Sequence, residues 1–177
     1  ERTRLAKYSG MKIMELLEKN IRPSDILTPE AFQNALAVDM ALGCSTNTVL
    51  HLTAIAYEAG VEMDLEMINE ISEKTPNLCR LSPAGPDHIE DLYWAGGILR
   101  VMKELDKKNH LNLEVKNVTA MDLKTILNEV REKPQNVIAS IDKPFSKTGG
   151  IAVLKGNLAP DGAVVKRSAV SKEMLVH

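Results

Sequence analysis

Gly43 separates two apolar stretches, and this junction constrains the fold more than any other feature of the sequence. The stretch that ends at Leu42 is rich in Ala and Met, and the stretch that begins at Asn47 is rich in Leu and Ala. Glycine commonly ends a helix in the left-handed conformation because it has no side chain to clash. Ser, Thr or Asn then accepts hydrogen bonds from the free backbone N–H groups of the next helix. Residues 43–48 therefore predict a tight turn between two helices.

The start of the second predicted helix has two readings. Its unpaired N–H groups and the positive end of its dipole together form a site that attracts anions. The small polar residues 45–48 either only cap the helix or also hold a carboxylate or phosphate. The residues alone leave both readings open.

Helical patterning extends over most of the chain before position 134. The first predicted helix should bury a stripe formed by Leu5, Tyr8, Met14 and Leu17. The apolar helix at 47–59 reads as central, with His51 either packed inside it or placed near a buried site. Residues 22–27 read as a connector, 78–81 as a strand or extended link, and 111–115 as a short strand. The predicted helices are residues 2–20, 28–42, 47–59, 64–75, 87–94, 98–107 and 119–133.

The residue pattern of the sequence changes from helical to β-type between positions 132 and 144. Two β-type runs follow, at residues 151–154 and 163–165, and a Pro-Asp-Gly sequence at 160–162 predicts the turn between them. We therefore predict an α+β chain with a helical part at 1–134 and the first hairpin of a β-rich part at 135–177. Such a hairpin is marginal by itself.

Composition excludes several classes of protein. Hydrophobic residues make up 44% of the chain but aromatic residues only 3%, which predicts an aliphatic core. The net charge of -2, from 22 basic and 24 acidic residues, argues against a nucleic-acid or anionic-membrane surface. No apolar run is long enough to cross a bilayer. The 2 Cys, without a secretory signal, indicate reduced thiols and a cytoplasmic location.

No complete catalytic or metal-binding set can be read from the residues. Cys44 and Cys79 are too few and too far apart for an iron–sulfur cluster, and no zinc-type spacing occurs. Ser45, His51 and Asp39 include a nucleophile, a base and an acid, but their spacing sets no triad. The polar residues at 88–91 read as a helix start that includes a capping box from Asp87 to Glu90. The loop at 146–150 either lines an anionic substrate through Lys147 or simply leads into a strand.

Four ordered stretches together resemble one enzyme family. Residues 43–52 (GCSTNTVLHL) are similar to the GGSTNTxLHL stretch of the dihydroxy-acid dehydratases, within the dihydroxy-acid and phosphogluconate dehydratase family. The others are 88–97, 146–154 and 156–166. Cys44 departs from the pattern, because the family more often has Gly there, and residues 128–134 lie where the family varies. The STNT sequence favours the dihydroxy-acid members over the phosphogluconate members, which resemble STNH at this turn.

The resemblance implies a function. Enzymes of this family convert 2,3-dihydroxy acids to 2-keto acids, here of the 2,3-dihydroxyisovalerate type, in branched-chain amino-acid biosynthesis. An iron–sulfur cluster acts as Lewis acid on the departing hydroxyl, Mg²⁺ binds the substrate, and a deprotonated serine removes the C2 proton. The family motifs that hold these groups have no match here, so the resemblance assigns no metal ligand and no catalytic residue. It also implies an α/β first domain, a β-barrel-like second domain, a cleft between them and a cytoplasmic homodimer.

From these motifs we expect seven residues to line the cleft of the parent enzyme: Ser45, Thr46, Asn47, Thr48, Ser146, Lys147 and Thr148. The chain begins without Met and ends at Met174-Leu-Val-His without a cap, which suggests an internal piece that is inactive alone. Two other readings stay open. One is a segment of a sugar-acid (aldonate or phosphogluconate) dehydratase, and the other is a non-catalytic helical interaction module.

Overall fold

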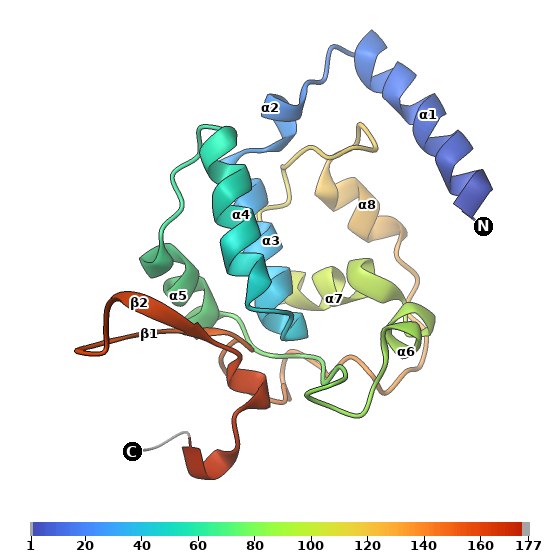
Figure 1. The fold of residues 1–177 in the computed structure, drawn as a ribbon. Coiled ribbons are helices and arrows are strands. Elements are labelled where there is room, and N and C mark those ends of the chain that lie inside the picture. The colour runs from blue at the N-terminus through green and yellow to red at the C-terminus, as the bar shows by residue number, and fades with distance from the viewer. Residues whose placement is uncertain (1, 175–177) are drawn as a thin grey trace.

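Helix α3 (Pro29–Leu42) is the element around which the other helices are arranged. In the computed structural model, which describes residues 2–174 apart from the side chain of Lys172, α3 contacts α4, α5 and α7 (Figure 1). The other helices are α1 (Arg2–Glu18), α2 (Pro23–Ile26), α4 (Asn47–Glu58), α5 (Leu65–Lys74), α6 (Ile89–Trp94), α7 (Gly97–Asp106) and α8 (Leu123–Glu129). The predicted cut at Glu1 and the last three residues lies outside the described part of the chain.

Both ends of α3 form as the sequence predicts. The Thr28 hydroxyl accepts a hydrogen bond of 3.3 Å from the backbone N–H of Ala31. Pro29 occupies the first helical position, where its missing N–H costs nothing. Gly43 ends the helix with φ 64° and ψ 55°, the left-handed conformation that favours glycine.

Two hydrophobic clusters share α3 and contact different sides of it. One side contributes Phe32, Leu36 and Met40 to a cluster shared with α4, α5 and Ile151. The other side contributes Ala37 and Ala41 to a cluster shared with α6, α7 and α8. Small residues on this second side let the neighbouring segments approach closely. Helix α3 is therefore buried on more than one side.

Both α1 and α4 are helices, as predicted, but the residues predicted to be buried in them are not. Of α1, only Leu16 is buried, and the predicted stripe is exposed. The apolar residues of α1 are spread around its axis rather than along one side, and in Figure 1 the helix stands apart from the others. Of α4, only Val49 and Ala56 are buried, and His51 is exposed. Neither reading proposed for His51 holds, because no described element covers that side of α4.

Helices α5 and α8 begin at acidic caps, and α8 is shorter than the predicted 119–133. Asp64 starts α5 by accepting from Met67 N–H at 2.8 Å, and Asp122 starts α8 by accepting from Thr125 N–H at 2.7 Å. At α6 the predicted capping box is shifted by one residue, because Asp91 accepts from His88 N–H at 2.7 Å. Gly96, with φ 116°, makes the predicted break before α7.

Two extended segments are not strands. Residues 111–115 lack a continuous partner and are held by isolated bonds, such as Lys124 N–H to Leu113 O at 3.1 Å, so the prediction of a strand there is wrong. Residues 78–81 form an extended link, and residues 22–27, predicted as a connector, contain the single turn of α2.

The C-terminal part forms the predicted antiparallel hairpin, with β1 (Ala152–Gly156) paired to β2 (Ala159–Val165) beside α5 (Figure 1). The turn lies at residues 157–158, not at 160–162 as predicted. Residues 160–162 instead fall in an irregular part of β2, because Leu154 pairs with Ala163 while Gly156 pairs with Ala159. Two 3₁₀ helices follow, η1 (Arg167–Ala169) and η2 (Lys172–Met174). Helices with an antiparallel hairpin confirm the α+β class.

The segment between α8 and the hairpin is attached to the helical part. Val137, Ile138 and Ile141 belong to the cluster that includes α7 and α8. The buried Glu104 carboxylate accepts from Ile141 N–H at 2.9 Å and from Lys107 Nζ at 2.7 Å. The division of the chain at residue 134 stays a prediction.

Candidate functional site

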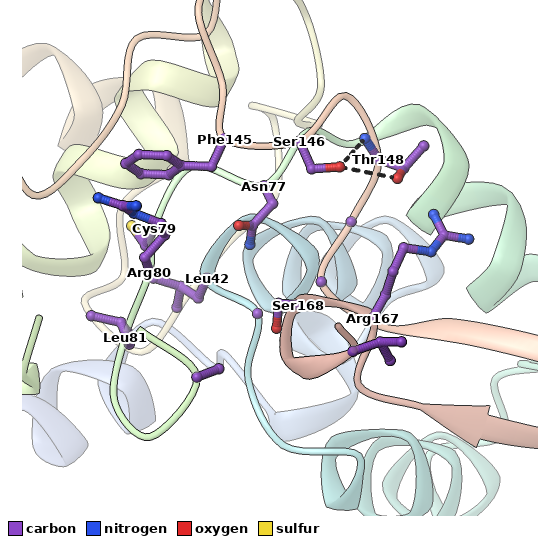
Figure 2. A pocket seen from close by; sticks show the side chains of 15 residues that line it. Leu42, Asn77, Cys79, Arg80, Leu81, Phe145, Ser146, Thr148, Arg167 and Ser168 are labelled. Carbon is purple, nitrogen blue, oxygen red and sulfur yellow. Dashed lines mark hydrogen bonds between the residues drawn. The ribbon is translucent and has the colours of Figure 1, made fainter. Parts of the chain in front are cut away.

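A hollow of about 620 Å³ lies where the end of α3, the link after α5 and the loop before β1 meet (Figure 2). Its polar lining comes from Asn77, Ser146, Thr148 and Ser168, together with the guanidinium groups of Arg80 and Arg167. Leu42, Gly43, Cys79, Leu81, Ala84, Phe145, Gly149, Gly150 and Val170 complete it. Among the described residues that line the hollow, none is acidic, so it favours an anion over a cation.

Two of the resembling stretches meet at this hollow through glycines. A Cβ placed on Gly150 would lie 2.4 Å from the Cα of Gly43, a distance that no side chain allows. Gly150 N–H also donates to Met40 O at 3.0 Å, within the last turn of α3. The end of α3 and the loop at 146–150 are therefore in backbone contact, which explains glycine at both positions.

Asn77 joins the link after α5 to both neighbours. Its amide donates to Met40 O at 3.3 Å and to Ala41 O at 3.1 Å, which satisfies carbonyls at the end of α3. Its backbone N–H donates to Ser146 O at 3.0 Å, and its carbonyl accepts from Phe145 N–H at 3.0 Å. The walls of the hollow are thus connected by hydrogen bonds rather than only placed side by side.

The two arginines of the hollow are held differently. The Arg80 guanidinium lies 4.4 Å from the centre of the Phe145 ring, and both are visible at one side of the hollow in Figure 2. Arg167 forms an ion pair of 2.6 Å with Glu73 on α5. Part of the charge of Arg167 is thereby neutralised, whereas stacking leaves the N–H groups of Arg80 able to bind a carboxylate.

The loop before β1 presents two hydroxyl groups. Ser146 Oγ lies 3.3 Å from Thr148 Oγ1 and also accepts from Thr148 N–H at 3.3 Å, as Figure 2 shows. Both side chains are half-buried at the hollow, whereas Lys147 between them is exposed. Of this predicted trio, the structure brings Ser146 and Thr148 to the hollow and leaves Lys147 outside its lining.

The turn at 45–48 lies next to the hollow but does not line it. Ser45 and Asn47 are exposed, and Ser45 Oγ accepts from Asn47 N–H at 3.2 Å. Thr46 precedes α4 without a side-chain cap bond, and Thr48 is half-buried near Asp39. The hollow reaches this motif only at Gly43. The expectation that these four residues line a cleft stays a prediction.

Asp39, on α3, gives the turn a buried negative charge. Its side chain is 4% exposed, and neither oxygen has a donor at hydrogen-bonding distance and angle. Burial raises the pKa of Asp39 above its ordinary value, while the nearby Thr48 hydroxyl, the Cys44 thiol and the Lys166 ammonium oppose that rise. The Asp39 carboxylate therefore lies near Thr48, in the first turn of α4, without accepting a hydrogen bond.

Sequence reasoning missed Asn77, Arg80, Arg167 and Ser168. Asn77 and Arg80 lie in a short link without any motif, so no local signal marks them. Arg167 and Ser168 directly follow residues 156–166, the last stretch that resembles the family. The basic pair Lys166-Arg167 is a local signal that could have indicated an anion-binding residue there.

The described residues do not fit an iron–sulfur cluster or a divalent metal. Between residues 2 and 174, no three His, Cys, Asp or Glu side chains are grouped to hold an ion. Burial raises the pKa of both Cys44 and Cys79 to about 12, so their thiols stay protonated, and thiolates are the form that binds metals. No helix in the described part of the chain has the length and apolar character needed to span a membrane.

Comparison with known proteins adds the identity of the family. Residues 1–126 match the family model described as "Dihydroxy-acid/6-phosphogluconate dehydratase N-terminal", and residues 136–177 match the corresponding C-terminal model. Over all 177 residues, dihydroxy-acid dehydratases of Acetivibrio thermocellus, Carboxydothermus hydrogenoformans and Ruminiclostridium cellulolyticum are 66%, 63% and 62% identical. The chain spans 32% of the length of each of these relatives. The chain therefore belongs to the dihydroxy-acid/6-phosphogluconate dehydratase family.

Proposed function

We propose that this chain is a segment of a hydro-lyase that converts 2,3-dihydroxy acids of the 2,3-dihydroxyisovalerate type to 2-keto acids in branched-chain amino-acid biosynthesis. The observation that carries this proposal is identity of 62–66% over the whole chain to three proteins named dihydroxy-acid dehydratase. The STNT sequence at 45–48 supports the same choice of substrate over a sugar acid.

The hollow has the chemistry that one wall of such a substrate cleft needs. The guanidinium of Arg80 suits a carboxylate, and the hydroxyls of Ser146, Thr148 and Ser168 suit the hydroxyl groups of a dihydroxy acid. The turn at 45–48 would extend this wall beyond the hollow. The segment thus binds and orients substrate, and the bond-breaking groups come from other parts of the enzyme.

The iron–sulfur cluster and Mg²⁺ of the parent enzyme would be held by residues outside this segment. The protonated Cys44 and Cys79 thiols and the lack of a grouped ligand set in residues 2–174 support that placement. The 177-residue piece alone is then inactive. We further propose that the full-length enzyme is a cytoplasmic homodimer.

Assay of the full-length protein that contains this segment tests the proposal. The purified enzyme should convert 2,3-dihydroxyisovalerate to its keto acid and should be slow on gluconate and 6-phosphogluconate. Activity on the aldonic acids alone would instead support a sugar-acid dehydratase. No turnover of any of the three by protein whose cofactors are shown to be bound would favour a non-catalytic module.

A second assay tests the hollow. Arg80→Gln should raise the KM for the dihydroxy acid about tenfold or more, since a charge-assisted contact contributes about 1.5–3 kcal/mol. Lys155→Gln is the matched control, because Lys155 is exposed on β1 and pairs with Glu66 at 3.0 Å, away from the hollow. Equal KM values for the two variants would show that the hollow is not part of the substrate cleft.

A further inference from the structure

The segment at residues 130–142 connects α8 to the loop of the hollow and forms no helix or strand of its own. Figure 1 shows it running from α8 past α7 toward β1. A segment without regular backbone pairing needs other partners to keep a fixed path. Its path matters, because Phe145, Ser146 and Thr148 follow within a few residues and line the hollow.

Charged side chains of α7 supply such partners. Lys103 Nζ donates to Val130 O at 2.7 Å, where the segment begins. The Glu104 carboxylate accepts from Ile141 N–H at 2.9 Å, where the segment ends. Helix α7 therefore holds the segment at both of its ends.

Arg100 is a buried cation one turn before these residues on α7. It is 8% exposed, its Nη1 lies 3.0 Å from Glu132 Oε2, and its Nη2 lies 3.9 Å from Glu104 Oε2. Its Nε is buried without a hydrogen-bond partner among the described residues. A buried guanidinium with unsatisfied donors depends strongly on the carboxylates beside it. One of these carboxylates belongs to the same helix, and the other belongs to the segment.

Gly96 makes room for the Arg100 side chain. A Cβ on Gly96 would lie 2.8 Å from Arg100 Cβ and 3.2 Å from Arg100 Cγ, so a larger residue would push the arginine away. The hollow gives no reason for the resembling stretch at 88–97, and this contact gives a steric reason for its first glycine.

We propose that Arg100 is a positioning residue that fixes the segment at 130–142 to α7 through Glu132 and thereby sets where the loop at 145–150 lies in the hollow. Glu104 is already held by Lys107 Nζ at 2.7 Å and by the segment's backbone. Glu132 is the partner at 3.0 Å, and it joins the cation to the segment. Only the effect on substrate binding rests on the proposed function, since the attachment itself is independent of the reaction.

Amide hydrogen exchange in the full-length protein tests the attachment. Arg100→Met leaves Glu132 without its cation, and exchange in peptides covering residues 130–142 and 145–150 should become at least about tenfold faster. Glu132→Gln should accelerate the same peptides about threefold or more, because Arg100 then keeps only the more distant Glu104. In an Arg100→Met background, Glu132→Gln should add less than about twofold, because the cation is already absent.

The matched control is Lys108→Met. Lys108 lies just after α7 and pairs with Asp142 of the same segment at 2.9 Å, but both side chains are more than half exposed. Exposed ion pairs contribute little, so exchange should change less than about twofold. Equal acceleration by Arg100→Met and Lys108→Met would overturn the proposal, as would an equal effect of Glu132→Gln in both backgrounds. If Arg100→Met prevents folding, which faster exchange throughout α3 to α5 would reveal, the comparison of Glu132→Gln with Lys108→Met decides alone.

Steady-state kinetics of the same variants separates positioning from a general loss of stability. Arg100→Met should raise the KM for 2,3-dihydroxyisovalerate about threefold or more and leave kcat within about twofold, and Arg100→Lys, which keeps the charge, should recover part of the KM. Turnover with an unchanged KM in Arg100→Met would overturn the link between the segment and the hollow. No turnover by the unmodified protein would count against the proposed function instead, and the exchange result would then decide the role of Arg100.

Discussion

Helices α3 and α4 are joined by one short turn and have similar apolar content, yet their burial differs sharply. α3 buries eight residues, while α4 buries only Val49 and Ala56. Leu50 and Tyr57 of α4 are 67% and 81% exposed. The difference teaches that an apolar helix is buried only where other elements are present to cover it. In this chain α5, α7 and the loop before β1 cover α3, and only one side of α4 has neighbours among the described residues.

Truncating one leucine in each helix should show the largest effect. Leu36 of α3 is 0% exposed, and Leu36→Ala should lower the free energy of unfolding by about 2–5 kcal/mol through lost burial and the cavity that remains. Leu50→Ala on α4 removes the same atoms and should change it by no more than about 0.5 kcal/mol. Denaturant unfolding followed by far-UV circular dichroism measures both. Similar losses for the two variants would mean that α4 is covered in solution.

Adding one methyl group where α3 ends should have the next largest effect. Gly150→Ala forces a Cβ against the backbone of Gly43, and we expect a loss of about 1–3 kcal/mol because backbone on both sides resists the shift. Gly156→Ala is the control, since a Cβ there meets nothing within 4 Å. The same unfolding measurement applies. A neutral Gly150→Ala would show that the loop before β1 is loosely attached to α3.

The N-terminal caps of the two helices provide a smaller contrast. Thr28→Ala removes the hydroxyl that accepts from Ala31 N–H, which should cost about 1 kcal/mol. Thr46→Ala should cost close to nothing, because Thr46 makes no side-chain cap bond to α4. A thermal-unfolding comparison distinguishes the pair. A larger loss at Thr46 would reveal a capping bond that forms in solution.

The smallest expected effect is a pH dependence from Asp39. The folded-state pKa of Asp39 is raised by burial, so the folded chain binds more protons than the unfolded chain above pH 3.8. Stability contributed at this site is therefore present below the unfolded pKa and is lost as pH rises through the folded pKa. As pH rises over that range, the free energy of unfolding of the Asp39→Asn variant should increase relative to that of the unmodified protein. Denaturant midpoints measured from about pH 4 to about pH 7 test the sign, and the opposite slope would mean that Asp39 is well paired when ionised.

Local signals predicted local structure well. Thr28-Pro29 and Gly43 mark the ends of α3, Asp64 and Asp122 mark the starts of two helices, and the glycines at 96–97 mark the break between α6 and α7. Each prediction depends on atoms within four residues, so neighbours in the sequence suffice. The errors at residues 111–115 and 160–162 concern strands, whose pairing is decided by distant partners.

The candidate site likewise combines residues that a local motif marks with residues that only folding brings together. Ser146 and Thr148 were predicted as cleft residues because they lie in a continuous motif, and their role in a substrate cleft stays a prediction. Asn77, Arg80 and Arg167 reach the hollow from separate parts of the chain, and only folding brings them together. Of the seven predicted cleft residues, Ser146 and Thr148 lie at the hollow, residues 45–48 lie in the turn beside it, and Lys147 lies outside both.

The sequence by itself determined most of the helices, the α+β class and the family, because capping residues, periodicity and ordered motifs are all properties of the linear chain. Only the tertiary structure decided which apolar faces are buried, which side chains share the hollow, and that Asp39 is buried beside the turn. These depend on contacts between residues far apart in sequence, such as Gly43 with Gly150, whose close approach no local pattern encodes.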